Sequence, residues 1–263
     1  MQTLSTNNLN EVVRQLEREP LRNIVLLKHI EAFPQHVSAV QILAEPNIAT
    51  LILLDTSAST YDRETYPEAA FAALISSGDA SLTHRLMKSV PNHCPVVFKL
   101  DNETDRDVVA DHFPLHRATS FLSFTADATP SLARDEAVLV STALSDVALS
   151  LFEAQGHLRE WLRPLLASDR AFACVLGQAG ETRSACIAFE NYRRIWEVGG
   201  VVTALQHRAQ GLASRVVRSA LAELQRRSLT PRYQVNEENL PSIRLARSVG
   251  LYQFLQLTHF RTW

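Results

Sequence analysis

A short basic turn between a strand pattern and a helix pattern is the part of this sequence best suited to bind an anion. Val201, Val202 and Thr203 are β-branched, as strand residues often are. From Leu212 onward apolar residues recur at helical spacing, so the turn 208–211 stands at a helix N-terminus. The first amides of a helix lack internal partners and carry the positive end of its dipole, and Gly211 lets an anion approach the backbone. The turn therefore predicts a phosphate site, although GxGxxG and GxxxxGK[ST] are both absent and an ordinary strand-turn-helix is the alternative.

The same turn resembles the acyl-CoA cradle of the GNAT superfamily of N-acetyltransferases, which has Arg or Gln, two residues, Gly, one residue, and Gly or Ala. Here it reads Arg-Ala-Gln-Gly-Leu-Ala over 208–213. Downstream, Asn-Leu-Pro-Ser at 239–242 opens a short segment that closes with Gly-Leu at 250–251, similar to a second motif of that family. The resemblance implies that acetyl-CoA, or another acyl-CoA, is the co-substrate. The residues it implies for binding are Val201, Val202, Thr203, Arg208, Ala209, Gln210, Gly211, Leu212, Ala213, Ser214, Asn236, Asn239 and Ser242.

Acyl transfer to an amine needs a proton acceptor, because a primary alkylamine with a pKa near ~10.4 is almost wholly protonated at neutral pH. Glu197 is the candidate base. It lies in an apolar strand pattern, where burial would raise its affinity for a proton, and eleven residues before Arg208, an interval at which some family members carry a catalytic Glu. The alternatives are an ion pair with Arg193 or Arg194, or a solvent-facing position.

Two glycines interrupt the same strand pattern at Gly199 and Gly200. Glycine weakens a strand interior and often marks a bulge or a close backbone approach. A tolerated kink is one interpretation. The family resemblance implies the other, a bulge where two parallel strands separate and the acyl-pantetheine chain pairs with 201–203.

The general acid is not evident. Many family members place a tyrosine four residues before the glycine of the terminal motif, where this chain has Ala246. Tyr233 and Tyr252 are near in sequence but match no motif position, and a thiolate with a pKa near ~8.5 leaves without strong acid assistance. Asn239 is expected to cap the short helix, and the resemblance also lets it contact the co-substrate.

Other candidate sites fail on spacing. His112 and His116 are four residues apart, but Pro114 between them would break a helix, so no metal is assigned. The cysteines, Cys94, Cys174 and Cys186, lack zinc-type spacing and are expected to be reduced and mostly buried.

Residues 128–263 follow the order of elements expected for the family. The patterns predict a strand at 137–140, helices over 144–166 interrupted near Gly156, a hairpin of 171–176 and 184–189, the strand 195–203, the helix from Leu212, a strand at 232–236 and a short helix at 243–249. In the hairpin, Cys174 and Cys186 are expected to be cross-strand neighbours that pack together, with a disulfide as the less favoured alternative.

Residues 1–127 carry no anion cradle. The only glycine before residue 156 is Gly78, and Asp79 beside it argues against phosphate. No internal repeat is visible in the sequence, and 126–131 reads as an interdomain linker. The patterns predict helices over 12–30, around 68–75, over 82–90 and over 105–113, with strands at 37–43, 50–54, 96–100 and one ending near Phe124.

Composition sets the remaining limits. The net charge of −2 over 263 residues suggests neither a nucleic-acid nor a membrane partner. The N-terminus lacks the features of a signal peptide and no apolar run reaches ~20 residues, so a cytoplasmic location is expected.

We expect an α/β protein with a mixed sheet and two domains. Residues 1–127 would form a smaller α/β or degenerate GNAT-like domain that shapes the acceptor pocket, and residues 128–263 a GNAT-like domain. The acceptor is expected to be a small-molecule or peptide amine, with a homodimer open as an assembly.

The expected function is an N-acyltransferase that moves an acetyl or other short acyl group from acyl-CoA to a primary amine by direct attack. The alternative is a non-catalytic acyl-CoA-binding sensor or scaffold. The missing tyrosine at Ala246 favours that alternative, whereas the turn at 208–213 together with Glu197 favours the enzyme.

Overall fold

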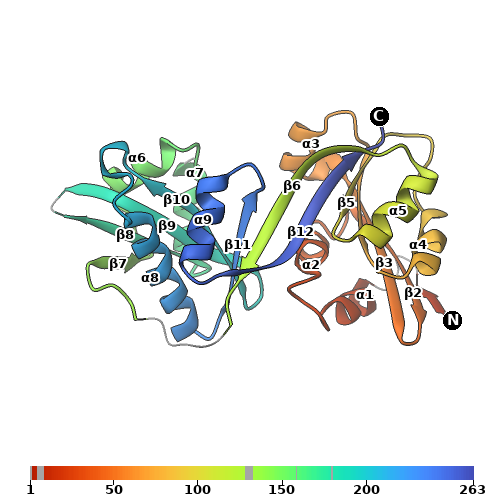
Figure 1. Cartoon of the computed structure of the whole chain (residues 1–263), viewed down its shortest axis with the longest axis horizontal. Coiled ribbons are helices and arrows are strands. Elements are labelled where there is room, and N and C mark those ends of the chain that lie inside the picture. The colour runs from red at the N-terminus through yellow and green to blue at the C-terminus, as the bar shows by residue number, and fades with distance from the viewer. Residues whose placement is uncertain (1, 5–8, 128–132, 158, 179) are drawn as a thin grey trace. The chain divides into compact units, whose positions relative to one another are not determined.

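The computed structural model of the chain describes residues 2–4, 9–127, 133–157, 159–178 and 180–263. The described chain separates into two compact units (Figure 1). Unit 1 comprises Met1–Phe121 and Leu255–Trp263, and unit 2 comprises Leu122–Phe254. This division falls six residues before the expected boundary at 127/128, and it places the last residues of the chain with the first unit. Residues 128–131 of the expected linker lie outside the described residues.

Unit 1 has a mixed sheet with helices on its faces. Strands β1 to β4 are antiparallel neighbours, and β4 then pairs with β5 in parallel. In chain order its elements are β1 (Gln2–Leu4), α1 (Leu9–Leu16), α2 (Ile24–Ala32), β2 (Val37–Ala44), β3 (Asn47–Asp55), the 3-10 turn η2 (Thr56–Ala58), α3 (Thr60–Thr65), β4 (Phe71–Ser76), α4 (Ala80–Met87), β5 (Val96–Leu100), α5 (Glu103–His112) and β6 (His116–Thr125).

Unit 2 has the same kind of sheet. Strands β7 to β10 are antiparallel neighbours, and β10 pairs with β11 in parallel. Its elements are β7 (Val138–Ser141), α6 (Asp146–Glu153), α7 (Arg159–Ala167), β8 (Ala171–Gln178), β9 (Glu181–Tyr192), β10 (Ile195–Thr203), the 3-10 turn η3 (Leu205–His207), α8 (Leu212–Arg226), β11 (Thr230–Asn236), α9 (Leu240–Ser248) and the start of β12 (Tyr252–Arg261), most of which belongs to unit 1.

The order of elements in unit 1 is therefore repeated in unit 2, apart from η2 and α3 in the first unit and η3 in the second. The final strand of each repeat crosses from one unit into the other. The C-terminal strand β12 pairs antiparallel with β5 of unit 1 through Thr258↔Leu100 to Arg261↔Val97. The last residues of β6 lie beside β11 in unit 2, where the Thr125 hydroxyl donates to the Pro231 carbonyl at 2.7 Å.

In unit 2, α8 and α9 pack on one face of the sheet and α6 and α7 on the other (Figure 1). Val198 of β10 packs with α8, whereas Val202 packs with α6 and α7. Two residues four positions apart share a face in a regular strand, so an irregularity must lie between them. The pairing of β10 with β9 shifts register between Gly199 and Val202, and Gly200 has a φ of +57°. The bulge expected at these two glycines is confirmed.

Most expected elements are found, with three differences. The pattern at 68–75 is wrong as a helix, because it contains β4, a central strand with buried residues on both faces, and a short continuous apolar run cannot be assigned by periodicity. The helix at 12–30 is two helices, because the segment 17–23 around Pro20 ends the first. The strands β1 and β12 and the short helix α3 were not expected.

Within the described residues, no helix is both long enough and apolar enough to cross a bilayer.

Candidate active site

The turn at 208–211 presents the N-terminus of α8 to an open space. Gly211 is the N-cap with a φ of +73°, and it has no side chain to accept hydrogen bonds from the first amides of the helix. A Cβ added at Gly211 would have no heavy atom within 4 Å. The first turn of α8 contains no acidic residue. These amides and the positive end of the helix dipole are therefore available to an anion.

A cavity of about 530 Å³ opens beside this turn. It extends from the turn along the end of β10 and the start of α9. Of the residues implied for co-substrate binding, the structure brings together Val201, Val202, Thr203, Arg208, Ala209, Gly211, Leu212, Ala213, Asn239 and Ser242 in its wall.

Gln210, Ser214 and Asn236 are not in that wall. The Gln210 amide donates to the Gln206 carbonyl at 3.4 Å, and the Asn236 side chain accepts from the Glu238 amide at 2.9 Å. Sequence reasoning missed four wall residues. Pro241 lies inside the motif at 239–242, and His207 directly precedes the turn at 208–211. No sequence signal connects Gln155 or Leu245 with the site.

Glu197 lies where β10 and β11 stop pairing. Their parallel register runs from Ile195↔Thr230 to Glu197↔Arg232, and beyond it the two strands no longer pair with each other. Glu197 is 7% exposed and Arg232 is 1% exposed. Their Oε2 and Nη1 atoms are 2.6 Å apart. The ion-pair alternative is therefore found, with Arg232 as partner in place of Arg193 or Arg194.

The rest of the Glu197 carboxylate is also held. The Gln234 amide donates to Oε1 at 2.7 Å, and the Asn191 side chain donates to Oε2 at 3.2 Å. Arg232 donates a further hydrogen bond to the buried Ser123 hydroxyl at 3.1 Å. A buried charge requires such partners, so this group joins β10 and β11 at the point where they separate.

The start of α9 has the expected cap. The Asn239 side chain accepts from the Ser242 amide at 3.1 Å, as an N-cap residue does. Ala246 is fully buried, so the position of the usual tyrosine offers no hydroxyl.

Tyr233 on β11 reaches the cavity indirectly. Its hydroxyl is 2.8 Å from the hydroxyl of Ser242, which lines the cavity wall. Burial raises the pKa of Tyr233, which keeps the phenol protonated near neutral pH. Tyr252 is bound elsewhere, with its hydroxyl donating to Asp127 at 2.9 Å.

The hairpin of β8 and β9 places Cys174 opposite Cys186, as expected, and both thiols are free and buried. The hydrogen bond with Cys174, together with burial, raises the pKa of Cys186 well above its usual value, so the thiol is not activated. In the described part of the chain, no group of three or more His, Cys, Asp or Glu side chains is arranged to hold a metal ion.

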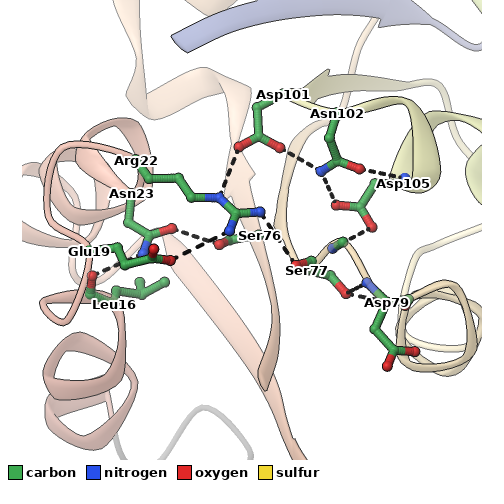
Figure 2. A network of polar contacts seen from close by, with 11 residues as sticks. Leu16, Glu19, Arg22, Asn23, Ser76, Ser77, Asp79, Asp101, Asn102 and Asp105 are labelled. Atoms are coloured by element: carbon green, nitrogen blue, oxygen red, sulfur yellow. Dashed lines mark hydrogen bonds and ion pairs between the residues drawn. The ribbon is translucent and has the colours of Figure 1, made fainter. Parts of the chain in front are cut away.

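The corresponding turn of unit 1, between β4 and α4, is arranged differently. Asp79 caps α4, with its carboxylate accepting from the amides of Ser81 at 3.0 Å and Leu82 at 3.1 Å. Arg22 donates to the Ser77 carbonyl at 3.4 Å and lies 3.6 Å from the Asp101 carboxylate (Figure 2). The first amides of α4 are thus already occupied by the Asp79 carboxylate, and Arg22 connects the residues that follow β4 and β5.

Comparisons with known proteins agree with this geometry. Residues 166–258 match the family model for GNAT acetyltransferase. No curated protein matches the sequence.

Several solved structures share the fold. A GNAT-family acetyltransferase from Colwellia psychrerythraea has a TM-score of 0.61 at 12% identity, covering 100% of both chains. A GCN5-related N-acetyltransferase from Sphaerobacter thermophilus has a TM-score of 0.58 at 14% identity, covering 90% of this chain and 84% of that one. A tandem GNAT protein from the clavulanic acid biosynthesis pathway has a TM-score of 0.54 at 13% identity, covering 99% of this chain and 97% of that one. The order of strands, the turn before α8 and the family match agree: residues 166–258 form a GNAT acetyltransferase domain.

Proposed function

We propose that this protein transfers an acetyl or other short acyl group from acyl-CoA to a primary amine. The observation that carries the proposal is the uncapped N-terminus of α8, which opens into a cavity that follows the free end of β10. A helix N-terminus with unsatisfied amides attracts phosphate, and the pyrophosphate of CoA is such a group.

The rest of the cavity suits an extended chain that leads away from the phosphates. Val201, Val202 and Thr203 continue beyond the last pairing of β10 with β11, so this side of β10 is not covered by β11. A pantetheine amide can pair with such a strand as another strand would. The acyl end would then lie toward Gln155 and the bulge at Gly200.

Direct transfer requires a neutral amine and a leaving thiolate. From the sequence, Glu197 was the expected proton acceptor. Its carboxylate is occupied by Arg232, Gln234 and Asn191, all of which stabilise the negative charge. We propose that Glu197 acts mainly by holding β10 and β11 at the point where they separate, and that Tyr233 with Ser242 offers a proton to the departing thiolate.

The cradle is tested by giving α8 the acidic cap that α4 already has. In calorimetric titration with acetyl-CoA, Gly211→Asp should raise Kd at least about tenfold, equivalent to about 1.4 kcal/mol, because its carboxylate competes for the amides and repels the pyrophosphate. Gly211→Asn is the matched control, since it has the same size, tolerates positive φ and carries no charge. Equal Kd values for the two variants and the wild type would place the pyrophosphate elsewhere.

A second candidate is an acyl-CoA-binding module without turnover, which the buried Ala246 at the usual tyrosine position favours. Release of free CoA thiol from acetyl-CoA in the presence of primary amines separates the two. Binding with no amine-dependent release would support the module.

A further inference from the structure

A histidine lies beside the bulge of β10, on the connection between α6 and α7. Of the nine histidines in the chain, only His157 and His207 belong to unit 2. His207 is in the turn before α8, and its ring is 2.8 Å from the Glu181 carboxylate. His157 is two residues beyond Gln155, which lines the cavity. It is therefore close in sequence to the cavity wall, and it lies beside Gly200, which directly precedes the wall residues of β10.

Close packing places the His157 ring against the backbone of β10. A Cβ built on Gly200 would lie 3.5 Å from His157 Nε2 and 3.4 Å from Phe152. The backbone of His157 is fixed by its amide, which donates to the Phe152 carbonyl at 3.2 Å. The absence of a side chain at Gly200 thus lets the imidazole approach the strand just before Val201.

Two aromatic rings lie against the half-buried imidazole. It stacks on Trp161 with ring centres 6.3 Å apart and planes at 28°, and its centre is 6.2 Å from that of Phe152. Trp161 in turn meets the edge of Phe189 at 5.8 Å. Phe189 pairs in register with Glu197, so these rings and the Glu197 side chain share the face of the sheet that α6 and α7 cover.

The ring nitrogens of His157 make no hydrogen bond or ion pair with any other described residue. Desolvation lowers the pKa of His157, so the ring is neutral near pH 7 and can accept a proton. The charged groups on the neighbouring elements are engaged mostly with one another: Glu153 with Arg159 at 2.7 Å, Arg163 with Asp146 at 3.0 Å, Glu190 with Arg170 at 2.7 Å and Glu197 with Arg232 at 2.6 Å, with Glu160 also present on α7.

We propose that His157 is the general base of the acyl transfer, in place of Glu197. The inference rests on the proposed function. The ammonium group of the acceptor gives one proton to Nε2, and the resulting amine attacks the thioester carbonyl carbon. The carbon–nitrogen bond forms, and the carbon–sulfur bond breaks with its electron pair leaving as thiolate. Tyr233 with Ser242 gives a proton to the thiolate and regains one from the nitrogen of the new amide, and His157 releases its proton to water.

The surroundings of His157 assist this transfer. The aromatic rings that lower its proton affinity also desolvate an ammonium ion placed beside it, which brings the two proton affinities closer together. An acceptor at the bulge would lie at the inferred acyl end of the cavity, whereas one at His207 would lie at the phosphate turn.

The first test needs no acceptor. Histidine ring signals are followed by NMR in the whole protein while acetyl-CoA is added, with His157→Gln used to assign the signal. The His157 signal should shift on saturation with acetyl-CoA, and the signal of His93, which is exposed in unit 1, should not. If calorimetry detects binding and the His157 signal stays unchanged, the ring is not at the acyl end and the inference is wrong. If acetyl-CoA does not bind at all, the proposed function itself fails.

The second test uses the acceptor that supports the fastest thiol release among 2-phenylethylamine, spermidine and glycinamide. His157→Gln should lower kcat/KM by about 10²- to 10⁴-fold near pH 7, with the Kd for acetyl-CoA unchanged within about twofold. The deficit should shrink as pH approaches the amine pKa of ~10.4, because the amine then deprotonates without help. His93→Gln is the matched control and should behave as wild type. A deficit that is absent or independent of pH would overturn the role of His157.

Discussion

The two turns that follow the fourth strand of each repeat differ in one way that decides what they can bind. In unit 1 the turn ends at Asp79, whose carboxylate occupies the first amides of α4. In unit 2 it ends at Gly211, which leaves the first amides of α8 without a side-chain partner. The same order of strands and helices precedes both turns, apart from η2 and α3 before β4. The residue at the cap thus decides whether the first helix amides already have a side-chain partner.

A second difference lies where the parallel strands end. Unit 2 joins β10 and β11 through a buried pair, with Arg232 and Glu197 2.6 Å apart at 1% and 9% side-chain exposure. Unit 1 joins the corresponding strand ends through Arg22, which is 38% exposed and 3.6 Å from Asp101 (Figure 2). The arginine in unit 2 is part of the core, while that in unit 1 stays partly in water.

Removal of each arginine should therefore have unequal effects. Arg232→Met leaves the Glu197 carboxylate buried without its cation and should lower the free energy of unfolding by about 3–5 kcal/mol. Arg22→Met should cost about 1 kcal/mol or less, as for a partly exposed pair. Urea unfolding followed by tryptophan fluorescence measures both, since Trp196 lies in unit 2 and Trp263 in unit 1. Arg232→Lys should recover part of the loss, and equal losses for the two methionine variants would contradict the comparison.

The two turns also predict the stoichiometry of binding. We expect one acetyl-CoA per chain, because the amides of α4 are already occupied by Asp79. Calorimetric titration of the full chain measures this number. Two equivalent sites would show that unit 1 binds the co-substrate despite its acidic cap, and the contrast between the turns would then lose its functional meaning.

The smallest expected effect concerns Asp79 itself. Hydrogen bonds from Ser81, Leu82 and Asn47 lower the pKa of Asp79 below its usual value. A carboxyl with a lowered pKa stabilises the fold above its unfolded pKa of ~3.9 and loses that effect as pH falls through the folded value. Asp79→Asn should therefore lower Tm slightly near pH 6, and the Tm difference from wild type should close in acid. A Tm difference for Asp79→Asn that is constant with pH would argue against the cap.

Local patterns predicted much of the fold. The strand β10 was expected with its observed bounds, and the α8 start at Leu212 and the Asn239 cap were also expected, because each depends on neighbours in sequence. The strand β4 was not, since it lies between β3 and β5 inside the sheet and its two faces are buried by elements distant in sequence. The repeat of elements was invisible because the two halves share an order of elements without a shared motif.

The site shows the same limit. The turn and the end of β10 are contiguous, so the sequence predicts much of the cavity wall. The Glu197 partner Arg232 lies thirty-five residues away, and only the parallel pairing of β10 with β11 brings them together. His157 has no motif around it, and its place beside Gly200 follows from the bulge together with the packing of α6.

The crossing of β12 into unit 1 has a consequence for how the chain can fold during synthesis. Residues 1–121 can form β1 to β5 as they emerge, but the strand that pairs with the far edge of β5 follows the whole of unit 2 in the sequence. Until then, β5 carries an unpaired edge of the kind that promotes association between chains. Contacts this distant in sequence slow folding, so unit 1 can be completed only after unit 2 has been synthesised.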